Sequence, residues 1–251
     1  MDRMIHTALN SIRNLYDIRF TTSQNLANMA VPGYRREMQN EGGSGFMLED
    51  GQLSPRAFAL EMGANQFSEE QGAIAPSDLA TDIALVNDSY FIVDPGAGNL
   101  ALSRRGDLKT NSEGQLIDGA GSVMMSSAMQ PIEIPAFREI QITQIGEVLV
   151  NPLQAEVGQF VSVGFISTTA PVAKMAKDLD GHIRYSDGTA ITPDQSGKIM
   201  QNALEASNVN PVEELVFSME MQRQFEINMK LISAAKDLDE GGAQLLRLPN
   251  E

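Results

Sequence analysis

The chain contains no cysteine and no tryptophan, and aromatic residues make up only 6% of it. The lack of cysteine excludes disulfide bonds, thiolate nucleophiles, iron–sulfur clusters and the usual cysteine-bound zinc sites. It does not fix the compartment, because a cytosolic chain and a chain exported unfolded through a narrow channel can both lack cysteine. With 14 methionines and a hydrophobic content of 42%, the core is expected to be aliphatic.

Basic charge and long hydrophobic runs are also scarce. The formal net charge is -15, which repels the phosphates of nucleic acids and of anionic membrane surfaces. No apolar run is long enough to cross a bilayer, and the first residues lack the apolar core of a signal peptide. We therefore expect no nucleic-acid partner, no membrane insertion, and export only through a dedicated apparatus.

Apolar residues near the N-terminus recur at intervals of three and four, which predicts one helix with a narrow apolar stripe. Pro32 and Gly33 end this segment, because proline disfavours a helical conformation in the residue before it and glycine accepts a positive φ. A helix of this kind must bury its stripe against another element. The stripe comprises Ile5, Leu9, Ile12, Leu15 and Leu26.

A second, longer helix is predicted at the C-terminal end. Asn210 is a candidate N-cap, Pro211 suits the first helical position, and acidic residues follow in the first turn. The Gly241-Gly242 pair is expected to end the helix. Its apolar stripe has the spacing of helices that pair, and by this pattern alone pairing within the chain is as good an interpretation as pairing between chains. The stripe comprises Val212, Leu215, Met219, Phe225, Met229 and Ile232.

The middle of the chain alternates short β-branched runs with turn residues, which predicts a β-rich domain. A hairpin is expected where Ser186-Asp187-Gly188 separates residues 182–185 from 189–191. The predicted fold is α+β, with a β-rich central domain and terminal helices that associate as a coiled-coil-like axial core. The predicted parts are an N-terminal axial helix and signature (1–34), an extended arm or loop (35–65), the β-rich domain (66–200) and a C-terminal axial helix (201–251). The other predicted strands are 83–86, 90–93, 100–103, 115–117, 140–145, 148–150 and 160–165.

Candidate active sites fail because no catalytic constellation is present. His6 and His182 lie far apart in sequence, and no serine has the setting of a nucleophile elbow. Residues 178–181 lack the ligand spacing of a calcium loop and are read as a turn. Arg104 and Arg105 are read as a salt-bridging strand end. We expect no enzymatic activity, no cofactor and no metal ion; a carboxylate-based hydrolase is the minor alternative, since acid pairs arise by chance among 33 acidic residues.

Two segments resemble the terminal signatures of the bacterial flagellar rod and hook proteins. The first is Asn25-Leu26-Ala27-Asn28 followed by Pro32-Gly33-Tyr34-Arg35-Arg36. The second begins at Leu204-Glu205-Ala206-Ser207-Asn208 and continues through 222–226 and 230–235. Residues 90–93 and 103–108 are also similar to landmarks of this family. Within the family, the opening residues and the length are most similar to the proximal-rod branch, with the distal-rod branch second.

The resemblance implies a structural subunit that polymerises through its terminal helices and transmits torque in the flagellar rod. Its partners would be copies of itself, other rod proteins and the flagellar export apparatus. Its location would be the basal-body rod, reached without a cleavable signal peptide. The alternatives are a distal-rod or hook-family axial subunit and a monomeric β-domain binding module. Subunit contacts are expected from Ile5, Leu9, Ile12, Leu15, Asn25, Leu26, Asn28, Gly33, Tyr34, Asn208, Asn210, Leu215, Met219, Phe225, Met229 and Ile232.

Overall fold

The structure is a computed structural model that describes residues 2–38, 44–47, 56–59, 66–96, 99–154, 156, 158–178 and 180–246. The chain divides into two compact units. The helical unit consists of Met1–Ala27, Met38–Gly63 and Asn210–Glu251. The β-rich unit consists of Asn28–Glu37 and Ala64–Val209. The fold is therefore α+β, as the sequence predicts.

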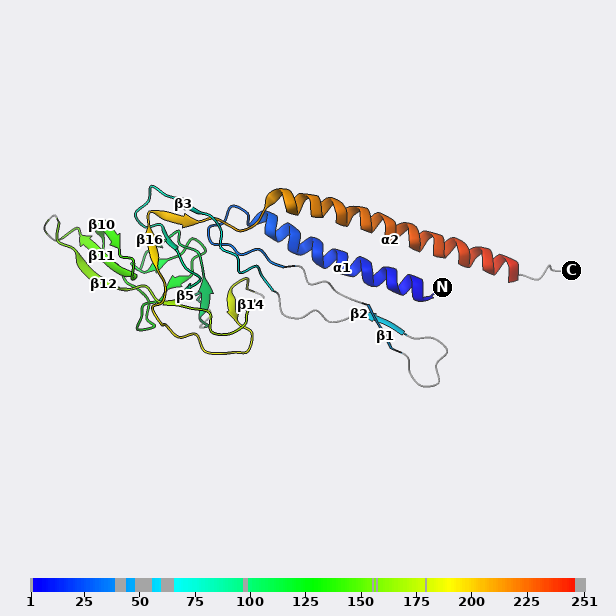
Figure 1. Cartoon of the computed structure of the whole chain (residues 1–251), viewed down its shortest axis with the longest axis horizontal. Coiled ribbons are helices and arrows are strands. Elements are labelled where there is room, and N and C mark those ends of the chain that lie inside the picture. The colour runs from blue at the N-terminus through cyan, green and yellow to red at the C-terminus, as the bar shows by residue number, and fades with distance from the viewer. Residues whose placement is uncertain are drawn as a thin grey trace. The chain divides into compact units, whose positions relative to one another are not determined.

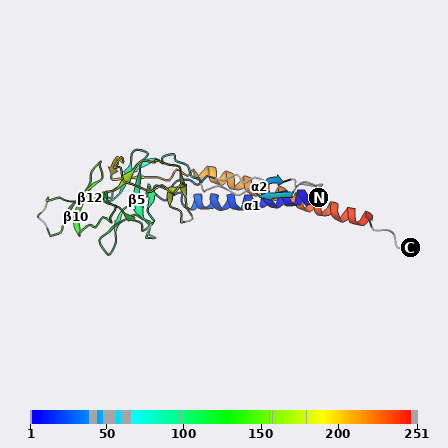
Figure 2. The ribbon, with the colours of Figure 1, turned by 90° about the horizontal axis from the view of Figure 1, so that it is seen from below.

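The helical unit is built on two long helices, α1 (Asp2–Ala27) and α2 (Pro211–Leu246). They lie side by side and run in opposite directions, as both views of the molecule show (Figure 1 and Figure 2). The predicted N-cap of α2 is confirmed, because the Asn210 Oδ1 accepts the backbone N–H of Val212 at 3.1 Å. Such a bond satisfies a donor that the first turn of a helix cannot pair internally.

The predicted end of α2 at Gly241-Gly242 is wrong. The helix continues through both glycines to Leu246, and neither adopts a positive φ. The residues that follow them, Ala243 to Leu246, are good helix formers. A pair of glycines ends a helix only where the chain turns into a left-handed conformation, and here it does not.

Part of the predicted arm contains a β-hairpin. Strands β1 (Ser44–Met47) and β2 (Arg56–Ala59) pair antiparallel within the helical unit. Residues 39–43, 48–55 and 60–65 of the predicted arm lie outside the described residues.

The β-rich unit contains the remaining strands. Among the described residues, the largest sheet has eight strands in the order β14-β15-β6-β5-β9-β8-β7, with β13 beside β5, and a second sheet has the order β10-β11-β12. The strands are β3 (Ile74–Pro76), β4 (Ile83–Leu85), β5 (Tyr90–Asp94), β6 (Ala101–Ser103), β7 (Lys109–Thr110), β8 (Leu116–Ile117), β9 (Val123–Met124), β10 (Phe137–Ile142), β11 (Glu147–Pro152), β12 (Val161–Phe165), β13 (Thr168–Thr169), β14 (Met175–Lys177), β15 (Ile183–Tyr185), β16 (Ile199–Gln201) and β17 (Ala203–Glu205).

The main core of this unit is aliphatic, as predicted. It joins the buried faces of β4, β5, β10 and β11, where Ile83, Leu85, Val93, Val148 and Val150 are fully buried. Strands β4 and β5 are buried on both faces, whereas β10 alternates between buried and exposed residues towards its end. A second cluster lies around Tyr90, Leu102 and Tyr185.

The predicted hairpin between residues 182–185 and 189–191 is wrong. Strand β15 pairs instead with the preceding strand, β14, and with β6. The turn between β14 and β15 is closed by Gly181, which has a φ of 80° and whose N–H bonds to the Asp178 carbonyl at 2.9 Å. A turn also forms after β15, where the Gly188 N–H bonds to the Tyr185 carbonyl at 3.2 Å, but residues 189–191 form no strand. The Asp180 carboxylate accepts the His182 N–H at 3.0 Å and reinforces this turn.

The last two strands extend the β-rich unit past the predicted boundary at residue 200. Strand β16 pairs with β4, and β17 pairs with β3. The unit runs to Val209 and also contains residues 28–37. Both ends of the chain are thus joined to this unit by segments that belong to the terminal signatures.

Candidate functional site

The two helices of the helical unit meet along a regular seam. The Asn25 Nδ2 donates to the Glu214 Oε1 at 3.4 Å, and the Asn228 Nδ2 donates to the Ser11 Oγ at 2.9 Å. From the first pair to the second, the position on α1 falls by 14 residues and the position on α2 rises by 14. The pairs are therefore in one antiparallel register, two heptads apart.

Between these pairs the seam is apolar. Leu15 on α1 and Met221 on α2 are buried, and Ile18 and Phe217 are half-buried. In α1 the seam positions 8, 11, 15, 18, 22 and 25 alternate by three and four, which is the spacing of a coiled-coil core. The seam thus has an apolar stretch around Leu15 and Met221 between the two polar pairs, and it continues past Ser11 and Asn228 to the buried Ala8 and Ala235.

The apolar residues of α2 that the sequence pattern singles out mostly lie outside this seam. Leu215 is 52% exposed and Met219 is 73% exposed, whereas Glu214 is fully buried. At 100° per residue, Val212, Leu215, Val216 and Met219 occupy the side of α2 opposite the seam. We call these four residues the apolar patch; it is unusual for a monomer to expose such a group of side chains.

A groove borders the seam on one side and has a volume of about 350 Å³. Exposed apolar side chains stand at its rim: Tyr16 on α1 is 73% exposed and Phe225 on α2 is 45% exposed. The groove is lined by Leu15, Tyr16, Arg19, Ser218, Met221, Gln222 and Phe225.

The predicted helical contact residues fall into three groups. Leu15 and Asn25 lie buried in the seam, as described above. Ile12, Leu26 and Ile232 are half-buried, while Leu9, Leu215, Met219, Phe225 and Met229 are exposed. The side chain of Ile5 lies outside the described residues. The structure therefore does not bury the predicted stripe of α2 against the α1 of the same chain.

In the β-rich unit, the two terminal signatures meet at a buried ion cluster formed by Arg35, Arg104 and Glu205, which we call the clasp. Each of the three side chains is at most 2% exposed. Glu205 on β17 forms ion pairs with Arg35 at 3.0 Å and with Arg104 at 2.5 Å. Its Oε1 also accepts the backbone N–H of Gly72 at 3.1 Å. The carboxylate thus connects the segment after α1, the strand before α2 and the body of the unit.

Arg104 uses every nitrogen of its guanidinium group as a donor. Its Nε donates to Glu205 at 2.8 Å, Nη1 donates to the carbonyls of Asn87 and Ser89, and Nη2 donates to the carbonyl of Leu85. Burial lowers the pKa of Arg104, and the neighbouring Glu205 carboxylate opposes that shift. The prediction that Arg104 and Arg105 form ion pairs is confirmed, since Arg105 pairs with Asp107 at 2.7 Å.

Backbone contacts place the N-terminal signature directly against the clasp. The Gly33 N–H donates to the Glu205 carbonyl at 2.7 Å, and Gly33 has a φ of 66°. A Cβ atom at this position would lie 2.3 Å from the carbonyl oxygen of Arg104. Only glycine tolerates both the left-handed conformation and this close approach.

Asn208 links the same two segments through its side chain. Its Oδ1 accepts the Arg36 N–H at 2.6 Å, and its Nδ2 donates to the Glu70 carbonyl at 2.8 Å. Four hydrogen-bonding partners from residues 34–36 and 68–70 surround it, because its own N–H donates to the Tyr34 carbonyl at 3.3 Å and its Nδ2 also reaches the Ser68 carbonyl. The predicted contact residues Gly33, Tyr34 and Asn208 therefore meet within one chain.

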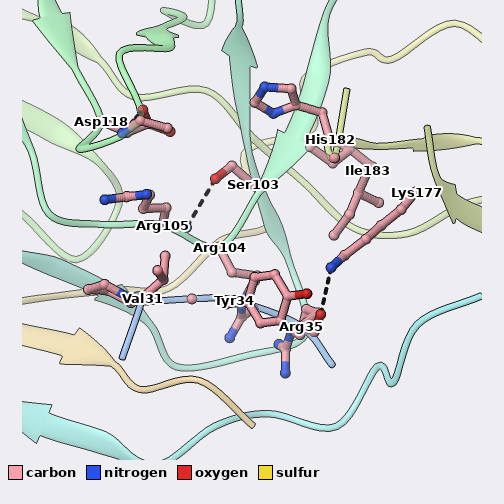
Figure 3. A pocket seen from close by; sticks show the side chains of 15 residues that line it. Val31, Tyr34, Arg35, Ser103, Arg104, Arg105, Asp118, Lys177, His182 and Ile183 are labelled. Carbon is pink, nitrogen blue, oxygen red and sulfur yellow. Dashed lines mark hydrogen bonds between the residues drawn. The ribbon is translucent and has the colours of Figure 1, made fainter. Parts of the chain in front are cut away.

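A small pocket of about 120 Å³ lies beside the clasp (Figure 3). Lys177 crosses the face of Tyr34, with its Nζ 3.9 Å from the ring centre, and donates to the Arg35 carbonyl at 2.7 Å. Burial lowers the pKa of Lys177, and its ion pair with Glu37 opposes that shift. His182 and Asp118 also line this pocket.

The buried carboxyl group of Asp118 links the stability of the β-rich unit to pH. Its Oδ1 accepts the N–H groups of Ala120 and Ser122, both at 2.9 Å, and burial raises its pKa. A raised folded-state pKa means that its stabilising contribution is present at acidic pH and is lost as the pH rises through that pKa. Because asparagine keeps the acceptor without the charge, Asp118→Asn should raise the melting temperature at neutral pH, and the gain should shrink near about pH 4. A parent chain at least as stable as the variant at neutral pH would contradict this assignment.

In the described part of the chain, neither the clasp nor the pocket beside it shows a group of side chains arranged for catalysis or metal binding. Within the ranges that the structure describes, no group of three or more metal-ligating side chains is placed to hold an ion. Lys177, Arg104 and Arg105 of the pocket are all engaged in ion pairs. What the arrangement can do is hold residues 28–37 and 203–209 together within the β-rich unit.

The clasp is the feature that sequence reasoning missed. Charged residues are almost never fully buried unless they are paired, so Arg35, Arg104 and Glu205 read as surface residues one by one. A signal was nevertheless present, since all three belong to the segments on which the family resemblance rests.

Comparison with known proteins agrees with this layout. Residues 200–245 match the family described as flagellar basal body rod FlgEFG protein C-terminal, and residues 84–150 match the flagellar hook protein FlgE/F/G D1 domain. The flagellar basal-body rod protein FlgF of Salmonella typhimurium is 26% identical, over 99% of this chain and 100% of the relative. FlgF of Caulobacter vibrioides is 28% identical over 98% of both, and FlgG of Buchnera aphidicola from Acyrthosiphon pisum is 28% identical over 89% of this chain and 92% of the relative.

The chain belongs to the flagellar rod and hook protein family. It is a structural subunit of that family, and the relatives named above are rod proteins and not enzymes. Its two family matches include clasp residues from different regions: Arg104 lies in the D1 match, and Glu205 lies in the C-terminal match together with most of α2. Neither helix, in the part of the chain described, is long and apolar enough to span a membrane.

Proposed function

We propose that this rod and hook family protein is a subunit of the proximal rod of the bacterial flagellum. Support for the proximal rod comes from coverage: FlgF relatives align with nearly the whole chain, whereas the FlgG relative of Buchnera aphidicola aligns with 89% of it. In this role the chain is carried out by the flagellar export apparatus and takes its place in the part of the basal body that spans the periplasm. There it transmits torque together with copies of itself and other rod proteins.

The observation that carries the proposal is the exposed apolar patch on α2. Burying four apolar side chains on one side of a helix is favourable by about 25 cal/mol for each Å² removed from water. Helices of neighbouring subunits supply such burial when they associate as a coiled-coil-like axial core. Contacts of this kind are heterologous, and heterologous contacts that do not close on themselves generate a helical tube.

The proposal predicts that Met219→Asp abolishes incorporation. A carboxylate at the centre of the patch would have to be desolvated in the assembled core, which costs several kcal/mol when no partner compensates it. Because Met219 is 73% exposed in the single chain, the fold itself should change little. Immunoblots of purified basal bodies and swimming in soft agar measure the effect.

Met219→Leu is the matched control for this experiment. It keeps an apolar side chain of similar volume at the same position and should be incorporated normally. Circular dichroism of both purified variants should match that of the parent. Normal motility and normal amounts of the Met219→Asp variant in basal bodies would rule out the patch as an assembly surface.

The second candidate is a distal-rod subunit, favoured by the 28% identity to the Buchnera aphidicola FlgG. Deletion of the gene separates the two. If the protein is proximal, basal bodies from the deletion strain should have a rod that stops near the cytoplasmic membrane. If it is distal, electron microscopy should show a proximal rod of normal length without its continuation.

A further inference from the structure

The groove that borders the seam runs along one side of the helix pair. Its floor contains Leu15 and Met221, which are buried, and its walls carry Tyr16 and Phe225, which are 73% and 45% exposed. Aromatic side chains gain more than most others from burial, and such rings are enriched where proteins bind one another. The helical unit thus presents to solvent an apolar hollow with aromatic walls.

Helical periodicity extends this groove towards the N-terminus of α1. Leu9 and Ile12 precede Tyr16 by seven and four residues, which places them on the same side of α1. On α2, Met229 follows Phe225 by four residues and lies on the same side as that ring. Leu9 and Met229 are 45% and 48% exposed. The predicted apolar stripes of the two helices therefore border one common groove.

The shape of the groove fits a third helix. In helical bundles, the apolar ridge of one helix packs into the groove between two others. The apolar patch is such a ridge, because its members recur at intervals of three and four residues on one side of α2 and are 52% to 73% exposed. A chain cannot seat its own patch in its own groove, since α2 itself forms one wall of the groove. The helix that fits belongs to another molecule, and a second copy of this chain carries one.

Charge also matches the patch to the groove. Arg19 is the charged residue among the described side chains that line the groove, in a chain whose formal net charge is -15. Glu213 and Glu220 are exposed and seven residues apart. At 100° per residue, both lie along one shoulder of the patch. Opposite charges at the edge of an interface steer association and fix its register.

We propose that the groove between α1 and α2 binds the apolar patch on α2 of a second copy of this chain. Tyr16 and Phe225 of one copy then cover Met219 of the second copy, and Arg19 faces the acidic shoulder of the patch. Because the groove and the patch are different surfaces, each copy offers its groove to one neighbour and its patch to another, so the contact repeats without closing. This inference rests on the proposed function and names the surface that receives the patch.

The absence of cysteine allows thiol crosslinking between two full-length chains. One chain carries Tyr16→Cys, the other carries Met219→Cys and a different epitope tag, and both are expressed together in place of the parent. Treatment of purified basal bodies with a short bismaleimide should give a dimer that contains both tags. Because each chain has a single thiol, this dimer can form only between chains.

Asp17→Cys is the matched control for Tyr16→Cys. Asp17 is exposed and follows Tyr16 directly, but it lies about 100° further around α1, away from the groove. Together with Met219→Cys it should give little or no mixed dimer. Equal yields from Asp17→Cys and Tyr16→Cys, or a crosslink from Tyr16→Cys to a different basal-body protein in place of the mixed dimer, would overturn the proposal.

An exchange of charges tests the same contact without thiols. Arg19→Glu and Glu220→Arg each place like charges across the interface, which is unfavourable. Either one alone should lower the amount of the chain in basal bodies by roughly tenfold, which corresponds to about 1.4 kcal/mol. The double variant restores opposite charges and should return this amount to near the parent level, with circular dichroism confirming the helices in all three variants. Normal incorporation of both single variants, or a double variant no better than either, counts against the proposal.

The outcomes separate this inference from the proposed function. If Met219→Asp is excluded from basal bodies while Tyr16→Cys and Met219→Cys give no mixed dimer, the patch remains an assembly surface with a different receptor, and only the groove proposal fails. If the parent chain is absent from basal bodies, the proposed function itself fails.

Discussion

Replacing Glu205 with leucine is expected to lower the free energy of unfolding of the β-rich unit by about 3–5 kcal/mol. The substitution leaves the buried guanidinium groups of Arg35 and Arg104 without the carboxylate that pairs with both of them. It also removes the acceptor for the Gly72 N–H. Since domains are stable by only about 5–15 kcal/mol, the loss should be visible as a large shift of the urea midpoint.

The unfolding can be followed through the tyrosines, because the chain has no tryptophan and Tyr90 lies in the core of this unit. Asp180→Asn is a suitable control, since it breaks an ion pair with Arg184 in which the aspartate side chain is 41% exposed, and it should cost no more than about 1 kcal/mol. A Glu205→Leu variant that unfolds at the same urea concentration as this control would show that the clasp contributes little to stability.

A triple variant separates the ion cluster from the shape of the site. Replacing Arg35 and Arg104 with methionine in the Glu205→Leu background removes the uncompensated charges and should recover part of the lost stability. Recovery should be incomplete, because Arg104 also donates to the carbonyls of residues 85, 87 and 89. Those carbonyls would lose their donors inside the fold.

The sequence predicted the parts of the structure that local patterns determine. The N-cap at Asn210, the two long helices and the aliphatic strands around Val93 and Val150 all follow from periodicity and turn chemistry, because each signal lies within a few residues of what it specifies. The hairpin after Tyr185 was predicted wrongly for a related reason. Turns form at both signals, residues 178–181 and 186–188, and an aspartate side chain accepts a backbone N–H in each. Only the first lies between two paired strands, because β15 finds its partners in β14 and β6.

The contacts between distant segments could not be predicted in this way. The seam of α2 includes Glu214, Met221 and Asn228, whereas the search for a helical stripe counts apolar residues and so passes over the polar members of the seam. Which side of a helix is buried depends on hydrogen-bonding partners that another segment provides. The clasp is hidden for the same reason, because the burial of Glu205 makes sense only when Arg35 and Arg104 are known to meet it.

The second large effect is expected from Gly33→Ala, which should destabilise the β-rich unit by about 3 kcal/mol or more. Two costs combine at this residue. A left-handed backbone costs a residue with a Cβ atom about 1–2 kcal/mol, and the new Cβ would also lie 2.3 Å from the Arg104 carbonyl oxygen. Because that oxygen belongs to the backbone, no side chain can move aside, and the signature segment has to shift away from Arg104.

Gly96→Ala is the control that isolates the second cost. Gly96 has a φ of 86°, yet nothing lies within 4 Å of the point that a Cβ atom would occupy there, so its substitution should carry only the conformational penalty of about 1–2 kcal/mol. Urea denaturation of the two variants therefore measures the close approach as a difference. If both lose the same stability, the contact between the N-terminal signature and the Arg104 backbone is not a constraint on the fold. If Gly33→Ala loses more, it should also break the Gly33–Glu205 hydrogen bond, and the segments that follow α1 and precede α2 would then no longer be held together on the β-rich unit.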